Sequence, residues 1–259
     1  MVVLILILLL APNVAYALEC MTDCTAGPFD FSEFFYIPDD QCHQHISRQH
    51  CSVSLTFNYR DKTYSVQFDD NPMSHDYIYI ASGPRLFYTV DYICPHEVDC
   101  TVSYARNLYN EMIKRDYNAE HLYTQIAPYI ENPSRESPLQ CYNINNQIIS
   151  CLPDELCTLK YDQINKMIES RGCISESTTH VGVFDSESSS YFYMNCALNL
   201  CNDIVTYTHI KTLFTVNNLN DTSRQRFSTG TKSIASSSSS FLLIFLLTSL
   251  IFKIKSFFS

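Results

Sequence analysis

The chain has 259 residues, a net charge of −10 and twelve cysteines. An acidic chain without a basic patch is a poor partner for nucleic acid or anionic lipid, so no nucleic acid is expected among its ligands. The cysteines are even in number and all lie between Cys20 and Cys201. This pattern indicates a disulfide framework and an oxidising, extracellular environment.

The N-terminus has the pattern of a secretory signal. An unbroken apolar run from Val2 to Leu10 is followed by the small-residue step Ala15-Tyr16-Ala17. A short apolar core before such a step is what signal peptidase recognises and cuts. A buried N-terminal strand or helix is the alternative. We expect residues 1–17 to be a signal peptide cleaved after Ala17, which places the protein on the secretory pathway to the outer face of the plasma membrane.

The C-terminal residues 241–259 form a hydrophobic tail behind a polar spacer of small residues. Small attachment residues, a spacer of about ten residues and a short apolar tail are the signature of a glycosylphosphatidylinositol (GPI) anchor. Ser228 is the expected attachment residue because Thr229 and Gly230 follow it, and Gly230 is the second choice. The protein is then held at the membrane by a lipid.

A short transmembrane helix is the alternative for this tail, with Lys253 and Lys255 on the cytoplasmic side. The apolar run from Phe241 to Phe252 has twelve residues. As a helix it covers only about 18 Å of a hydrocarbon core about 30 Å thick, which favours the lipid anchor. Residues 203–240 are expected to form a juxtamembrane stalk and spacer, with a glycan acceptor at Asn220 in an Asn-Asp-Thr tripeptide.

The cysteines fall into two groups of six, which divides the extracellular part into two segments. Residues 18–100 are predicted to form a first six-cysteine β module, and residues 141–202 a second one. Residues 101–140 contain three prolines but no cysteine, which indicates a helix followed by a linker. The predicted fold class is therefore disulfide-rich α+β, with two small antiparallel β modules and an intervening amphipathic helix.

The first segment has a clear strand pattern. Apolar and polar residues alternate from Ser52 to Tyr59 and from Tyr64 to Phe68, on either side of a four-residue polar turn. Such period-two alternation predicts an antiparallel hairpin with one dry face. Residues 77–80 and 86–93 are rich in aromatic and branched side chains and are two further strand candidates.

The segment without cysteines has helical periodicity. Its apolar residues recur three and four positions apart, and Glu111 can pair with Arg115 one turn later. We predict a helix over about residues 103–117 that resumes to 126, with Thr101 as its N-cap and its apolar face on the first sheet. A membrane-binding role for this helix is the alternative, and the mixed charge of its polar face disfavours it.

The second segment resembles a known family in its cysteine motifs. It opens with Cys141-Tyr142, carries Arg171-Gly172-Cys173 in the middle and closes with Cys196-Ala-Leu-Asn-Leu-Cys201-Asn202. Over 62 residues this pattern resembles the lymphocyte-antigen-6/urokinase-receptor (LU, three-finger) family. The resemblance implies fingers of antiparallel strands and the disulfides Cys141–Cys157, Cys151–Cys173 and Cys196–Cys201.

The second segment departs from the family in two ways. It has six cysteines where the family usually has five bridges, although the missing positions also form whole pairs. Tyr161, Ile164, Met167 and Ile168 have helical spacing where the family has its second-finger hairpin. The third finger fits better, because two apolar stretches flank a serine-rich turn there.

The first segment has its cysteines in a similar order and is interpreted as a more distant copy of the second. By that analogy Cys20 pairs with Cys51, Cys24 with Cys42 and Cys94 with Cys100. Six cysteines allow fifteen connectivities, so these pairs depend on the analogy alone.

Catalytic motifs are missing from the sequence. It has no glycine-rich phosphate loop and no G-x-S-x-G, H-E-x-x-H or paired C-x-x-C pattern. No catalytic residue and no cofactor are therefore assigned. One cluster, Cys42, His43, His45, His50 and Cys51, could bind zinc in a reducing cell. Outside the cell its cysteines are expected to form disulfides, which disfavours a metal site.

The expected function is that of a binding, adhesion or receptor-like protein at the cell surface. Its finger loops, including the aromatic stretch from Tyr191 to Met194, are expected to contact an extracellular protein ligand. The acidic charge favours a basic ligand. One alternative is a non-signalling structural or protective coat protein that associates with itself. A secreted hydrolase is a second alternative, and the lack of catalytic motifs disfavours it.

Overall fold

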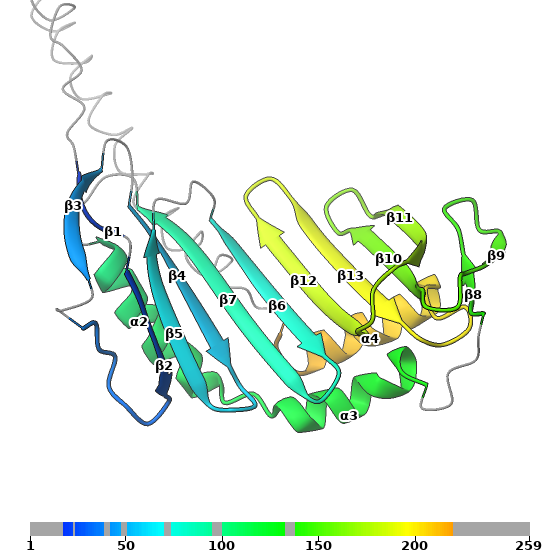
Figure 1. The fold of residues 1–259 in the computed structure, drawn as a ribbon, viewed down its shortest axis with the longest axis horizontal. Helices are drawn as coiled ribbons and strands as arrows, with labels where there is room; N and C mark the ends of the chain where they lie inside the picture. Colours follow the sequence, from blue (N-terminus) through cyan, green and yellow to red (C-terminus); the bar gives the residue numbers. More distant parts are fainter. Residues whose placement is uncertain are drawn as a thin grey trace, which may run out of the picture.

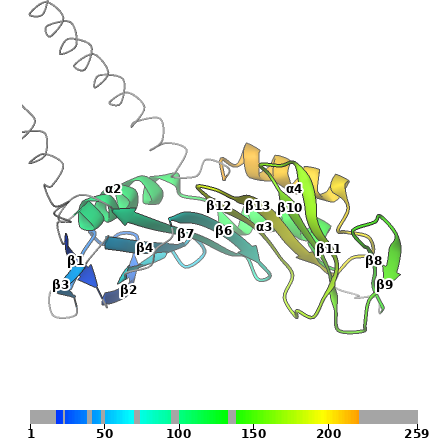
Figure 2. The same cartoon turned by 90° about the horizontal axis from the view of Figure 1, so that it is seen from above.

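The computed structural model describes residues 18–22, 24–38, 42–47, 51–69, 74–94, 100–132 and 138–219. Its main feature is a nine-stranded antiparallel sheet with the strand order β11-β10-β13-β12-β6-β7-β4-β5-β2. The helices α2, α3 and α4 lie along one face of this sheet (Figures 1 and 2). The chain is thus a disulfide-rich protein of antiparallel sheets and a few helices.

The elements follow the order of the chain. The strands of the first segment are β1 (Leu18–Thr22), β2 (Cys24–Asp30), β3 (His43–Ser47), β4 (Cys51–Asn58), β5 (Thr63–Asp69), β6 (His75–Ala81) and β7 (Arg85–Cys94). Two helices come next, α2 (Cys100–Arg115) and α3 (Ala119–Ile130). The second segment contains β8 (Gln140–Tyr142), β9 (Ile148–Ser150), β10 (Leu156–Asp162), β11 (Met167–Ile174), β12 (His180–Ser186), β13 (Ser190–Cys196) and α4 (Ile204–Val216). The pairs β1–β3 and β8–β9 form separate two-stranded sheets.

The predicted hairpin is confirmed as β4 and β5. Its alternating apolar residues all point to the helix-covered face, where Leu55, Phe57 and Val66 have no exposed surface. Tyr59 extends the same face and donates its hydroxyl hydrogen to the Met112 carbonyl of α2, at 2.9 Å. The alternation therefore selects the face on which the helix packs. The other two strand candidates of this segment are confirmed as β6 and β7.

The prediction of two small separate β modules is wrong, because β6 of the first segment pairs with β12 of the second. The pairing is antiparallel and has seven matched positions, from His180 opposite Ala81 to Ser186 opposite His75. Each strand would otherwise be the open edge of its own sheet, with unpaired backbone groups. Pairing removes both edges and joins the two apolar faces into one surface that the helices cover.

The two halves of the large sheet repeat one arrangement. The order β5-β4-β7-β6 in the first half matches β11-β10-β13-β12 in the second. The register matches as well, since Cys51 lies opposite Cys94 and Cys157 opposite Cys196. Because β6 and β12 are antiparallel, an approximate two-fold axis relates the halves. The β4–β5 and β6–β7 turns lie at one end of the sheet, and the β10–β11 and β12–β13 turns at the other (Figure 1).

The helical part of the chain differs in detail from the prediction. Helix α2 begins at Cys100, so Thr101 lies in its first turn and is 2% exposed rather than acting as the N-cap. The chain then turns at Asp116, whose φ is +39°. Asn118 caps the second helix, and its side chain accepts a hydrogen bond from the backbone N–H of His121. The two predicted helical stretches are therefore two separate helices, and the second has its own N-cap.

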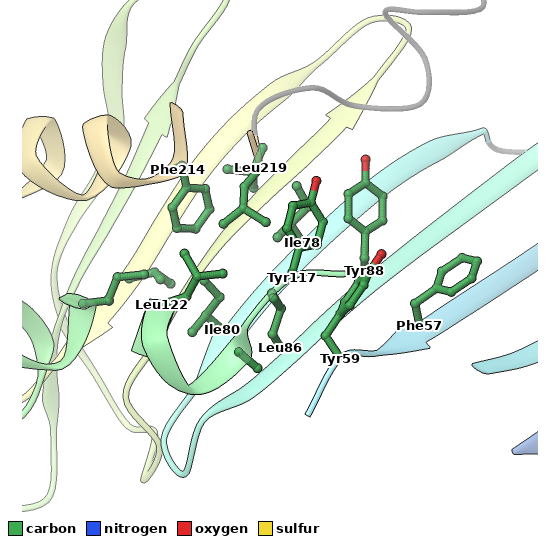
Figure 3. Packing of buried hydrophobic residues seen from close by; sticks show 14 of the residues in the cluster. Phe57, Tyr59, Ile78, Ile80, Leu86, Tyr88, Tyr117, Leu122, Phe214 and Leu219 are labelled. Atoms are coloured by element: carbon green, nitrogen blue, oxygen red, sulfur yellow. The ribbon is translucent and has the colours of Figure 1, made fainter. Parts of the chain in front are cut away.

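Pro128, which indicated a linker in the sequence, lies inside α3. The helix continues through it because Leu122, Ile126 and Ile130 form an apolar stripe that is at most 2% exposed. This stripe lies over the place where β6 meets β12, and Figure 3 shows Leu122 beside Ile80 in this core. Burial of the stripe against both halves outweighs the hydrogen bond that a proline removes from a helix.

The first part of the predicted stalk is folded. Helix α4 starts after Asp203, whose side chain accepts a hydrogen bond from the N–H of Thr206. Its Tyr207 ring stacks on Tyr161 of β10 at 4.3 Å and meets Phe192 of β13 edge-on at 4.9 Å. Several predicted features lie outside the described residues: the glycan acceptor Asn220, the lipid attachment sites Ser228 and Gly230, the signal peptide with its cleavage site after Ala17, and the hydrophobic tail 241–259. Within the described residues, no helix is long and apolar enough to cross a membrane.

Two histidines occupy equivalent places at the β6–β12 pairing. His75 and His180 are the first residues of their strands. The ring of His75 lies 4.9 Å from Phe184, and the ring of His180 lies 5.0 Å from Tyr79. Burial lowers the pKa of His180, and this effect exceeds the opposing effects of the Thr178 carbonyl and the Glu176 carboxylate. The folded protein therefore favours the neutral imidazole.

Acidification should weaken the fold through His180. Its folded pKa lies below the ordinary value of 6.5, so the unfolded chain takes up the proton first as the pH falls. The contribution of His180 to the free energy of unfolding is therefore complete above that value and is lost progressively below it. Urea unfolding of the non-reduced protein at pH 7, 6 and 5 measures this loss. His180→Gln should have a smaller loss than the wild type, and equal losses in both proteins would contradict the prediction.

Candidate ligand-binding surface

Three disulfides hold the base of the second segment. Cys141 of β8 is joined to Cys157 of β10, and Cys151, which follows β9, to Cys173 of β11. The third disulfide joins Cys196 of β13 to Cys201. These are the pairs that the family resemblance implies. The β8–β9 hairpin, here called finger I, is thereby attached to the β10–β11 hairpin, finger II. The β12–β13 hairpin is finger III.

Three further disulfides hold the first segment. They join Cys20 to Cys51, Cys24 to Cys42 and Cys94 to Cys100, the pairs expected by analogy with the second segment. The two cysteines of the potential zinc cluster, Cys42 and Cys51, are thus in two different disulfides. His43 and His45 lie in β3, and His50 lies outside the described residues.

Finger II is a hairpin although its apolar residues have helical spacing. Asp162 ends β10, and its Oδ1 accepts hydrogen bonds from the N–H groups of Ile164 and Asn165, both at 2.9 Å. These hydrogen bonds lower the pKa of the Asp162 carboxyl and hold the turn. Ile164 and Met167 point to solvent, being 54% and 57% exposed. Their spacing reflects two sides of a turn and not one face of a helix.

Finger I is held against finger II by an arginine. Arg171 of β11 donates from Nη1 to the Oδ1 of Asn146 at 2.6 Å, and its guanidinium lies 4.4 Å from the ring centre of Tyr142. Within finger I, Asn143 closes the turn by accepting hydrogen bonds from the N–H groups of Asn145 and Gln147. The turn is therefore fixed both internally and to its neighbour.

Asn202, the last residue of the closing motif, connects three strands. It is completely buried. Its Oδ1 accepts from the N–H of Tyr142 at 3.0 Å, and its Nδ2 donates to the carbonyls of Tyr142 at 2.9 Å and Thr158 at 3.0 Å. A third carbonyl, that of Gly172, lies 3.4 Å from the same nitrogen. One side chain thus hydrogen-bonds to backbone groups of β8 in one sheet and of β10 and β11 in another.

The prediction that the stretch from Tyr191 to Met194 is a finger loop is wrong, because it belongs to strand β13; its contact with a ligand stays a prediction. Phe192 and Met194 point into the core and are at most 1% exposed. Tyr193 covers Gly182 of the neighbouring strand so closely that an added Cβ would clash with its ring and hydroxyl. The aromatic residues of this finger therefore build the sheet.

Fingers I and II carry exposed aliphatic side chains that the sequence analysis missed. Five residues of these fingers and of the bend between them, here called the fingertip set, are 50–67% exposed: Ile144, Ile148, Leu152, Ile164 and Met167. Large apolar residues inside short Asn- and Asp-rich turns were the available signal, because such turns usually expose polar residues. Phe34 and Tyr36 of the first segment are also more than half exposed.

A hollow of about 650 Å³ lies where α3 meets both halves of the sheet. Its lining includes Arg85, Tyr123, Glu131 and Thr179. The Glu131 carboxylate accepts hydrogen bonds from the hydroxyls of Tyr123 and Thr179, the latter at 3.0 Å. Burial and this carboxylate raise the pKa of Tyr123, which keeps its hydroxyl protonated. Glu131 therefore joins α3 to the residues that precede β12.

No protein-family model and no curated protein sequence matches this chain.

Replacing Asn202 should destabilise the second segment. Asn202→Ala removes the hydrogen bonds that this completely buried side chain makes to Tyr142 and Thr158 and leaves a small cavity, which we expect to lower the free energy of unfolding by about 2–4 kcal/mol. Guanidinium unfolding of the non-reduced protein measures this change. The control Asn107→Ala, at an exposed position of α2, should change stability by less than about 0.5 kcal/mol. Similar effects of the two substitutions would contradict the role given to Asn202.

Proposed function

We propose that the protein is a lipid-anchored cell-surface protein of three-finger type that binds an extracellular protein ligand. The observation that carries this proposal is the fingertip set, five large apolar side chains that are at least half exposed on two braced hairpins and the bend between them. Apolar side chains held rigidly in solvent lose little conformational freedom when a partner covers them. Binding in this form needs no catalytic group and no cofactor.

The three-finger assignment is supported by strand order and by Asn202. Two segments of the chain each have the finger II and finger III strands in the same order. The residue after the last cysteine connects finger I to finger II through four backbone groups. The motif that suggested the family therefore has a physical task in this fold, which is to hold the fingers at a fixed angle.

Charge favours a basic partner. Loss of the residues beyond Ser228 removes Lys232, Lys253 and Lys255, so the net charge changes from −10 to −13. Opposite charge on the ligand speeds encounter and selects among partners, and the apolar fingertips supply contact area. A protein surface with both properties fits the fingertips better than a small polar molecule does.

The mode of attachment can be tested on cells that express the full-length chain. Phosphatidylinositol-specific phospholipase C cuts a GPI anchor and leaves a transmembrane helix intact, so we expect the enzyme to release the protein into the medium. Immunoblotting of cells and medium before and after treatment measures the release. A co-expressed transmembrane protein is the control, and retention of the chain on treated cells would contradict the lipid anchor.

The role of the fingertips can be tested by charge substitution. Cells that display the wild-type chain are incubated with unmodified cells from the same organism, and cell–cell conjugates are counted by flow cytometry. The double variant Ile144→Asp with Ile164→Asp should reduce binding about tenfold or more, because desolvating two carboxylates in an apolar contact costs more than 1.4 kcal/mol.

The matched control is Asn107→Asp on the exposed side of α2, which should bind like the wild type at equal surface amounts. Equal binding by the fingertip variant and this control would contradict the proposal. Conjugates that form only between two cells displaying the chain would favour the alternative of a self-associating coat protein.

A further inference from the structure

Helix α4 exposes a face without any charged residue. Its exposed positions are all aliphatic, Thr or His: Ile204, Val205, Thr208, His209, Thr212, Thr215 and Val216. Three of these are large apolar side chains with 45%, 57% and 72% exposure, namely Ile204, Val205 and Val216. The one charged residue of the helix, Lys211, bends over Tyr207 and donates to its hydroxyl at 3.1 Å.

The threonine hydroxyls of this face already have acceptors inside the helix. Thr208 donates to the carbonyl of Ile204 at 2.7 Å, Thr212 to that of Thr208 at 2.8 Å, and Thr215 to that of Lys211 at 3.0 Å. A hydroxyl with a satisfied donor costs less free energy to remove from water than a free one. The face can therefore be covered by an apolar medium at low cost.

The fold itself does not require that the outer face of α4 lack charged residues. Helix α2 occupies the equivalent place in the first half, after the last strand of its sheet, and it exposes Arg106 and Lys114 among other polar residues. The two helices thus share their position but not the chemistry of their outer faces. The uncharged face of α4 indicates a contact that α2 does not make.

The position of α4 in the chain identifies what covers its face. It is the last helix of the described residues, and the predicted lipid attachment at Ser228 comes nine residues after Leu219. Nine fully extended residues reach at most about 30 Å, which holds α4 close to the bilayer. We infer that the outer face of α4 lies on the membrane surface, in contact with the lipid interface.

The contact of α4 with the membrane depends on the proposed lipid anchor and does not replace it. A few partly exposed aliphatic side chains bind a bilayer weakly on their own, whereas a tether raises their local concentration so that a weak contact is occupied. The acidic chain fits a zwitterionic surface better than an anionic one. With α4 on the membrane, the helix-covered face of the sheet points toward the bilayer and its other face points away.

Single tryptophans test this contact, because the native chain contains none. Full-length Val205→Trp and Val216→Trp are expressed in cells, purified in detergent and reconstituted into phosphatidylcholine vesicles, with and without lipids brominated near the headgroup. Gln67→Trp, at an exposed position on the uncovered face of β5, and Leu152→Trp near finger I are the controls. We expect blue-shifted emission and quenching by the brominated lipid for the two α4 variants, and neither effect for the controls.

The outcomes separate this inference from the proposed function. It depends on membrane attachment but not on ligand binding. Protein that does not float with the vesicles would contradict the attachment itself. Protein that floats without tryptophan quenching would overturn only the α4 contact. A blue shift in α4 variants without quenching would mean that protein, for instance a second copy of the chain, covers the face, and would also overturn the inference.

Discussion

The antiparallel pairing of β6 with β12 is the interaction on which the rest of the structure depends. Seven matched positions join two disulfide-bonded halves into one sheet. The pairing places Ile78 and Ile80 of one half beside Val181 and Val183 of the other, all at most 5% exposed. Helix α3 packs across this joint surface, in contact with β7 of the first half and β13 of the second. The disulfides fix each half internally, but none of the six connects the two halves.

Local patterns predicted the individual strands well and the joining of the sheets poorly. The alternation around residues 52–68 predicted β4 and β5, since a dry face needs every second residue to be apolar. The choice of β12 as the partner of β6 leaves no comparable trace, because any strand with a buried face offers the same backbone groups at its edge. The paired strands are about one hundred residues apart in the sequence, and what they share is one core with the helices that cover both halves.

The errors at the candidate surface have local physical causes. Ile164 and Met167 have the spacing of a helix, but Asp162 closes a turn between them and makes them fingertips. The aromatic residues after the serine-rich turn suggested a contact loop, whereas Phe192 and Met194 are core residues. Composition therefore located the fingers but assigned their exposed and buried residues in the wrong places. The role of Asn202 could not be predicted, because its three partner strands come together only in the fold.

The two halves differ most where the proposed contacts lie. The first-half turn after β4 is polar, with Asn58 bonded to Asp61 and Arg60 to the Gly83 carbonyl. The equivalent turn after β10 exposes Ile164. The helices that follow the last strand of each half differ in the same way. Helix α2 exposes charged residues, and α4 exposes none. A packing requirement would act on both halves alike because their strand order is the same. Apolar residues that are exposed at these equivalent places in the second half but not in the first therefore argue for contacts outside the fold, made by the fingertips with a ligand and by α4 with the membrane.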